Sequence, residues 1–73
     1  MRASKLTSDQ FKEWRMKRGM SQDACARCIG ISKSTVALYE IGKRREGVVV
    51  IPYTVALAMN CIENNLPPYG ETL

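Results

Sequence analysis

Three cysteines carry the most reactive side chains of this sequence. Cys25 and Cys28 form a Cys-x-x-Cys pair, Cys61 stands far along the chain, and the sequence contains no histidine. A structural zinc ion takes four Cys or His ligands, and this chain offers only three. Redox pairs of this spacing belong to a strand–helix context, and no strand pattern precedes Cys25. We therefore expect no metal, no cofactor and structural thiols, with Cys25 in the core.

A second set of polar side chains could bind phosphates and base edges. The run Ser32-Lys33-Ser34-Thr35 follows a glycine closely, and Lys43-Arg44-Arg45 comes a short way further on. Hydroxyl and cationic groups of this kind contact nucleic acids. Residues 1–45 hold all eleven Lys and Arg against four acids, whereas residues 46–73 hold three acids and no base. This asymmetry favours a polyanion as the partner of the first part, although a solvated basic face has the same pattern.

The elements that position these groups must belong to a single small domain. The chain has 73 residues, 45% hydrophobic and 25% charged, which suits one domain over residues 1–73. No apolar run approaches the roughly 18 residues of a membrane span, and the start of the chain has no apolar signal core. We expect a cytoplasmic protein without membrane contact.

Apolar spacing predicts three helices in the first part of the chain. The first covers residues 8–18, with Thr7 or Ser8 as its cap. The second starts at Ser21 and is closed by Gly30, and the third starts at Ser32 and ends near residues 41–42. Two short helices joined by a glycine-containing turn form a helix-turn-helix, with its core at about 21–42.

The remainder of the chain is predicted as a basic loop and a fourth helix. Residues 43–47 form the loop, and the β-branched run 48–51 is either a buried extended segment or a short strand. Pro52 opens a helix over about 53–64. The fold class is all-α, a small bundle of four to five helices. The predicted core side chains are Phe11, Trp14, Cys25, Ile29, Ile31, Val36 and Tyr39.

The turn between the second and third helices determines the geometry of this motif. Gly30 takes a conformation that other residues resist, Ile31 enters the core and fixes the interhelical angle, and Ser32 caps the next helix. The arrangement presents the N-terminus of the third helix, the end that enters a DNA major groove.

The segment SQDACARCIGISKSTVALYEIGKRR resembles the Cro/C1-type (XRE) helix-turn-helix family, and FKEWRMKRGMSQ before it is similar to the family's first helix. The resemblance is gapless from Phe11 to Arg44 and implies a lambda-repressor-like DNA-binding domain. It implies that Arg15 and Glu40 form a salt bridge between the first helix and the recognition helix. The DNA-binding residues that it implies are Gln22, Ser32, Lys33, Ser34, Thr35, Leu38, Lys43, Arg44 and Arg45.

The implied roles of these residues differ. Gln22 would contact a phosphate and brace the recognition helix. Residues 32–35 would make base and phosphate contacts from the first helical turn, and residues 43–45 would contact the DNA backbone. Leu38 departs from the polar base reader that many relatives place there. It would contact a thymine methyl, or else it is a partly covered surface leucine.

The C-terminal part, EGVVVIPYTVALAMNCIENNLPP, resembles a subset of the family, the phage anti-CRISPR-associated (Aca) repressors. This resemblance implies a homodimeric autorepressor that binds an inverted repeat in a shared promoter. The fourth helix is apolar around most of its circumference, and a domain of this size covers one side only. We therefore expect a dimer through this helix, unless the domain wraps the helix itself. The predicted interface residues are Tyr53, Val55, Leu57, Met59 and Ile62.

The sequence thus predicts a transcriptional repressor that binds double-stranded DNA as a homodimer, without enzymatic activity and without a small-molecule ligand. One alternative is an antitoxin-like module whose C-terminal helix binds another protein. A second is additional binding of an RNA leader, which the absence of evident base-stacking aromatics disfavours.

Overall fold

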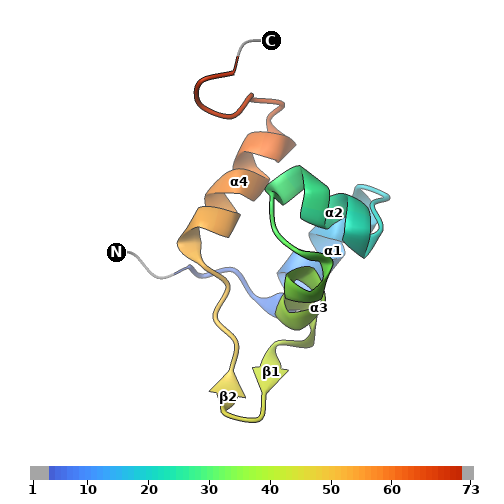
Figure 1. The fold of residues 1–73 in the computed structure, drawn as a ribbon, viewed down its shortest axis with the longest axis vertical. Coiled ribbons are helices and arrows are strands. Elements are labelled where there is room, and N and C mark those ends of the chain that lie inside the picture. The colour runs from blue at the N-terminus through green and yellow to red at the C-terminus, as the bar shows by residue number, and fades with distance from the viewer. Residues whose placement is uncertain (1–3, 72–73) are drawn as a thin grey trace.

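The computed structural model describes residues 4–71, which form four helices and a short hairpin (Figure 1). The elements are α1 Ser8–Lys17, α2 Gln22–Ile29, α3 Lys33–Ile41, β1 Lys43–Arg44, β2 Gly47–Val48 and α4 Tyr53–Glu63. The predicted small helical bundle with a helix-turn-helix is confirmed. The predicted basic loop is wrong in one respect, because most of it belongs to a two-stranded antiparallel hairpin.

Short polar side chains begin the helices of the helix-turn-helix region. Thr7 and Gln10 form a capping box at α1, in which Thr7 Oγ1 accepts from the Gln10 N–H at 3.1 Å and the Thr7 N–H donates to Gln10 Oε1 at 3.0 Å. Ser21 Oγ accepts from the Ala24 N–H at 3.1 Å at the start of α2. At α4, Pro52 is the N-cap residue rather than the first helical one.

The core lies where α1, α2, α3 and α4 meet. Phe11 and Tyr39 pack edge to face, with their ring centroids 5.7 Å apart and their planes at 79°. Trp14, Ile29 and Ile31 pack against this core but are only partly buried. Trp14 stays at the edge, where its indole N–H donates to Glu63 Oε1 at 2.8 Å. The buried apolar residues are Phe11, Cys25, Ala26, Val36, Tyr39, Ile51, Val55 and Met59.

Helix α4 places part of the predicted dimer face inside its own domain. Val55 and Met59 stand one turn apart, are 5% and 7% exposed, and belong to the same core as Phe11. They therefore cannot form an exposed interface, and the prediction is wrong for both. Tyr53 and Ile62 are partly buried, whereas Leu57 faces outward and is 50% exposed.

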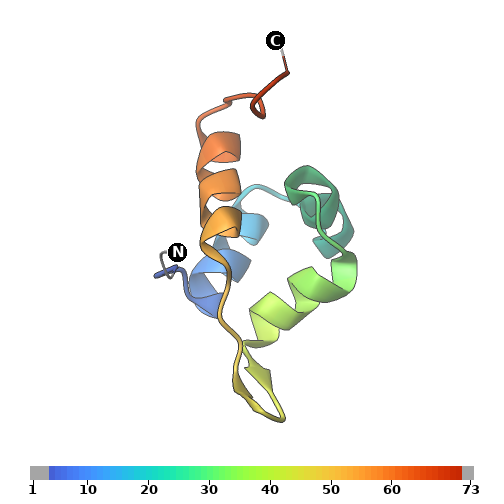
Figure 2. The same ribbon diagram turned by 60° about the vertical axis from the view of Figure 1, so that its left-hand side comes forward.

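The hairpin projects beyond the helices in both ribbon views (Figures 1 and 2). Lys43 pairs with Val48 and Arg44 with Gly47, so Arg45 and Glu46 form the turn. The Val49 N–H donates to the Gly42 carbonyl at 3.1 Å, which extends the pairing toward α3. The β-branched run at 48–51 is therefore extended, and only its start is assigned to a strand.

The tail after α4 leaves the helices at the end opposite the hairpin (Figure 1). Tyr69 in this tail is fully exposed, unlike the buried aromatics Phe11 and Tyr39. Within residues 4–71, no helix is both long and apolar enough to cross a membrane.

Candidate nucleic-acid interface

The first turn of α3 carries a cluster of hydroxyl groups. Gly30 ends α2 in the left-handed conformation, at φ 89° and ψ 33°, and the chain then turns through Ile31 to Ser32. Ser32 Oγ accepts from the Thr35 N–H at 3.2 Å and lies 2.7 Å from Thr35 Oγ1 and 3.1 Å from Ser34 Oγ. The predicted turn and cap are confirmed, and the three hydroxyls meet at one helix N-terminus.

The polar residues of the turn differ in how firmly they are held: Ser34 Oγ contacts only Ser32 Oγ, whereas Ser32 and Thr35 make further contacts. Ser32 and Thr35 are tied to each other and to the backbone, which secures the start of α3. Lys33 and Ser34 are exposed on the same turn. The helix N-terminus adds partial positive charge and unpaired N–H groups at this point. The turn therefore offers a site for phosphate oxygens, with an ammonium and a hydroxyl beside it.

Leu38 and Ala37 follow on the next turn of α3, and both are partly buried. Neither belongs to the apolar cluster that forms the core. Leu38 is four residues after Ser34, so the two side chains share one side of the helix. Leu38 is thus a partly covered surface leucine whose remaining surface lies beside Ser34, which leaves a thymine-methyl contact open to it.

An ion pair with two further hydrogen-bonding partners fixes α3 to the rest of the domain. Arg15 binds Glu40 with two nitrogens, Nε to Oε2 at 2.6 Å and Nη2 to Oε1 at 3.1 Å. Arg15 Nη1 also donates to the Met20 carbonyl at 2.8 Å, and Gln22 Nε2 donates to Glu40 Oε1 at 3.2 Å. The predicted salt bridge and the predicted bracing by Gln22 are both present, and together they join α1, α2 and α3.

The protonation of this network follows from its burial. The side chains of Arg15 and Glu40 are only 13% and 6% exposed. Burial alone would raise the pKa of Glu40, but the hydrogen bonds from Arg15 and Gln22 outweigh it and lower that pKa below its usual value. The hydrogen bond with Glu40 raises the pKa of Arg15. Both groups are charged at neutral pH, and the pair is bidentate and directional.

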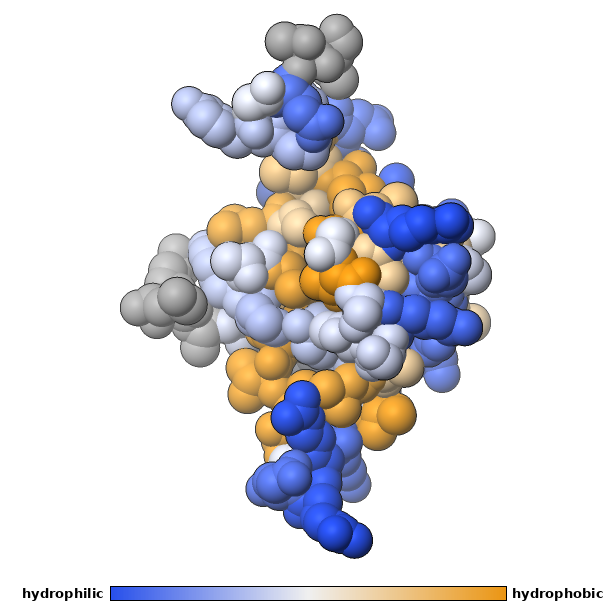
Figure 3. Space-filling model, in the orientation of Figure 1, coloured by the Kyte–Doolittle hydropathy of each residue, from blue (hydrophilic) through white to orange (hydrophobic). Residues whose placement is uncertain are grey.

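The basic residues after α3 lie on the hairpin. Lys43, Arg44 and Arg45 are all exposed, and within the described part of the chain none forms an ion pair. Figure 3 shows hydrophilic side chains at the hairpin end of the molecule, with apolar surface directly next to them. A pair of strands holds these cations together on one projection, which a flexible loop would not do.

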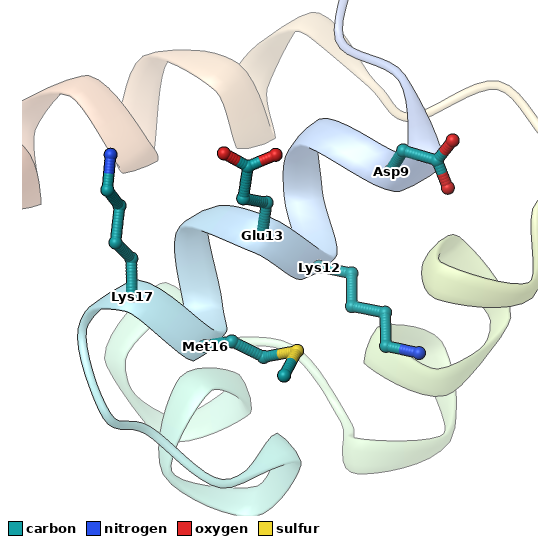
Figure 4. Close-up of a pocket in the computed structure, with 5 residues that line it drawn as sticks. All are labelled: Asp9, Lys12, Glu13, Met16 and Lys17. Atoms are coloured by element: carbon teal, nitrogen blue, oxygen red, sulfur yellow. The ribbon is translucent and has the colours of Figure 1, made fainter.

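The other candidate features have no such convergence. A shallow depression on the outer face of α1 is lined by Asp9, Lys12, Glu13, Met16 and Lys17. Its side chains fan out in different directions, so no group of donors or acceptors is aimed at one point (Figure 4).

The thiols do not meet at a common site. Cys25 is buried, Cys28 is exposed and Cys61 is partly buried, and all three are free. Burial raises the pKa of the Cys25 thiol, which suits its predicted place in the core. Among residues 4–71, no three or more His, Cys, Asp or Glu side chains gather in a way that could hold a metal ion.

Comparison with known proteins identifies the same part of the chain. Residues 11–45 match a family model described as Helix-turn-helix. This segment contains most of α1, all of α2 and α3, and the start of the hairpin, and it is just under half of the chain. No curated protein and no solved structure matches the chain. The match supports a DNA-binding role in the regulation of transcription.

Proposed function

We propose that this protein is a sequence-specific transcriptional repressor that binds double-stranded DNA as a homodimer. The observation that carries the proposal is the first turn of α3, where Lys33 and Ser34 are exposed beside a capped helix N-terminus. The network of Arg15, Glu40 and Gln22 holds this turn at a fixed angle to the other helices. In such a motif, the N-terminal residues of the recognition helix read base edges in the major groove.

The contacts divide into base reading and backbone binding. Lys33, Ser34 and Thr35 reach base edges or phosphates, and Leu38 makes an apolar contact with a thymine methyl. Gln22 braces α3 and contacts a phosphate with its remaining polar atoms. Lys43, Arg44 and Arg45 on the hairpin contact the DNA backbone, which adds affinity without sequence information.

The regulated promoter is the protein's own. The resemblance of residues 46–68 to anti-CRISPR-associated repressors supports an autorepressor of a phage operon that acts on an inverted repeat, in the cytoplasm at the nucleoid. The bound dimer would occlude polymerase. Two recognition helices would then enter successive major grooves about 34 Å apart.

The test is a fluorescence-anisotropy titration of the protein against the promoter upstream of its own gene. A scrambled duplex of equal length is the control, and both titrations are run at near-physiological salt. We expect a preference of at least about a thousandfold for the promoter. Equal, weak and salt-sensitive binding to both duplexes would contradict the proposal and favour the antitoxin-like alternative.

Three alanine variants assign the contacts. Ser34→Ala should reduce the preference for the promoter more than it reduces binding to the scrambled duplex. Arg44→Ala should weaken binding to both duplexes equally and reduce the magnitude of the slope of log K against log salt by about one unit. Lys17→Ala is the charge-matched control, because Lys17 lies with Trp14 and Glu63 on the α1–α4 side, away from the first turn of α3. An unchanged salt slope for Arg44→Ala would refute the role of the hairpin.

A further inference from the structure

Three apolar side chains at the base of the hairpin are turned to solvent. Ile41 is 68% exposed, Val48 81% and Val50 68%. Side chains alternate between the two faces of an extended segment, so Val48 and Val50 share one face. Val49 and Ile51 take the other face, which packs against the core. The valines of this run are therefore split between the core and an exposed apolar strip.

Among residues 4–71, no backbone group pairs with the outer edge of this segment. Residues 42 and 49 are directly opposite in the register of the hairpin, and they are joined by the bond from the Val49 N–H to the Gly42 carbonyl. Hydrogen-bonded and non-hydrogen-bonded pairs alternate in an antiparallel ladder. The N–H and C=O groups of Val48 and Val50 therefore point away from β1. Such an edge is a template for another strand, and here no lysine or proline blocks positions 48–50.

We infer that this edge, residues 48–50, is the surface on which a second copy of the chain docks, through antiparallel pairing about a two-fold axis at Val49. In this register Val48 lies opposite Val50 of the second copy, and every outward N–H and C=O of both residues finds a partner. A register centred on Val50 would place Val48 opposite Pro52, which has no N–H to donate. A register centred on Val48 would place Val50 opposite Glu46 in the turn.

The charge of the hairpin is compatible with a second copy as the occupant. Antiparallel pairing sends the two basic hairpin turns in opposite directions, so that Arg45 lies beside residue 53 of the second copy. The two Arg45 residues are then separated by roughly 25 Å along the strand direction. The cations do not oppose each other, and the two apolar strips of Val48 and Val50 meet on one face.

The rival surface on α4 is weaker than the sequence indicated. Val55 and Met59 belong to the core, and of the large apolar residues in α4 only Leu57 is exposed in the described chain. Pairing of β2 edges is isologous, as an inverted repeat requires. In this one respect the inference rests on the proposed function.

The test exploits the cross-strand contact between Val48 and Val50 of the second copy. Two double variants are made in the full chain, Val48→Glu with Val50→Glu, and Val48→Lys with Val50→Lys. Each variant alone places like charges opposite each other, and an equimolar mixture places opposite charges there. Both positions are exposed, so folding is checked by circular dichroism and is expected to be unchanged.

Sedimentation equilibrium over a concentration series gives the result. Wild type should show a reversible dimer, each double variant should raise the dimer dissociation constant at least about tenfold, and the mixture should restore a heterodimer. Leu57→Glu is the control and should dimerise like wild type. The inference is overturned if both double variants dimerise like wild type, if Leu57→Glu alone abolishes the dimer, or if wild type stays monomeric.

The anisotropy titration keeps this inference separate from the proposed function. If wild type prefers the promoter but the double variants still dimerise, the pairing edge is wrong and the repressor proposal stands. If the charge-swapped mixture restores the dimer but wild type shows no preference for the promoter, the edge stands and the repressor proposal fails.

Discussion

Removal of the Glu40 side chain should be among the most damaging single changes to this domain. The Arg15 side chain is 13% exposed, and Glu40→Ala leaves its guanidinium with only the Met20 carbonyl as a hydrogen-bond acceptor. Breaking one partner of a buried ion pair typically costs 3–5 kcal/mol, because the other charge is left uncompensated. Since Arg15 is not fully buried, we expect the lower end, about 3 kcal/mol. A domain of this size loses about 4–8 °C of Tm per kcal/mol, so Tm should fall by about 12–24 °C.

A double-mutant cycle separates this pair from general loss of packing. Arg15→Ala should also cost about 3 kcal/mol, because it leaves the carboxylate of Glu40 buried with Gln22 as its remaining donor. The double variant removes both charges together, so its cost should be far below the sum of the single costs. Arg27→Ala is the control, because it breaks an ion pair with Asp23 that is 3.6 Å long and whose side chains are 76% and 58% exposed. That change should cost no more than about 0.5 kcal/mol.

Urea unfolding measures these costs. Circular dichroism at 222 nm and the fluorescence of Trp14 provide two probes, and coincident transitions establish two-state unfolding. Purely additive costs of Arg15→Ala and Glu40→Ala would refute the argument, as would a Glu40→Ala cost equal to that of Arg27→Ala. In either case the short distances would reflect an ion pair that contributes nothing net to stability.

Two further outcomes follow from the same region. The pKa of Glu40 is lowered in the folded protein, and an unfolded glutamate has a pKa of about 4.3, so the unfolded state binds its proton first as the pH falls. The stability that Glu40 contributes should be present above that pH and lost as the pH falls through the lower folded pKa. Glu40→Gln should therefore make the free energy of unfolding depend less on pH between pH 5 and 3. A pH dependence as steep as that of wild type would contradict this. Gly42→Ala should lower the Tm more than Gly30→Ala does. Both glycines have positive φ, but only at Gly42 would an added Cβ collide with Ser8 Oγ and lie 3.1 Å from Ser8 Cβ. Backbone strain from positive φ should by itself lower the free energy of unfolding of Gly30→Ala by about 1 kcal/mol. Equal losses for the two variants would show that Ser8 moves aside freely.

Local signals predicted most of the helix-turn-helix correctly. Ser21, Gly30 and Ser32 act through their own backbone and the next few residues, so their effect on helix ends can be inferred without tertiary contacts. The Arg15–Glu40 pair joins residues far apart in sequence, and its prediction came from the family resemblance. Its extension to the Met20 carbonyl carried no sequence signal, because a main-chain acceptor exists at every residue.

The parts beyond the motif were harder to predict for a physical reason. The residues of α4 are apolar on most sides, so periodicity does not say which stripe faces inward. Packing against the core selects the stripe of Val55 and Met59, and this selection is a property of the whole domain. The run at 48–51 is equally ambiguous, because β-branched residues on both faces hide the alternation that burial reveals.

Gly42 connects the recognition helix α3 to the hairpin, the two elements on which the proposed DNA binding and dimerisation depend. Gly42 ends α3 in the left-handed conformation, its N–H binds the Leu38 carbonyl, and its carbonyl accepts the Val49 N–H. The Ser8 side chain, at the start of α1, occupies the space that a Cβ at residue 42 would need. Hydrogen bonds on both sides of Gly42 therefore tie the hairpin to the recognition helix. A dimer formed through the β2 edges would inherit this fixed direction, so the spacing between its two recognition helices would be set by the fold rather than by a flexible linker. A substitution at Gly42 that still folds should accordingly change the preferred half-site spacing, which a series of operators with altered spacers would measure by anisotropy.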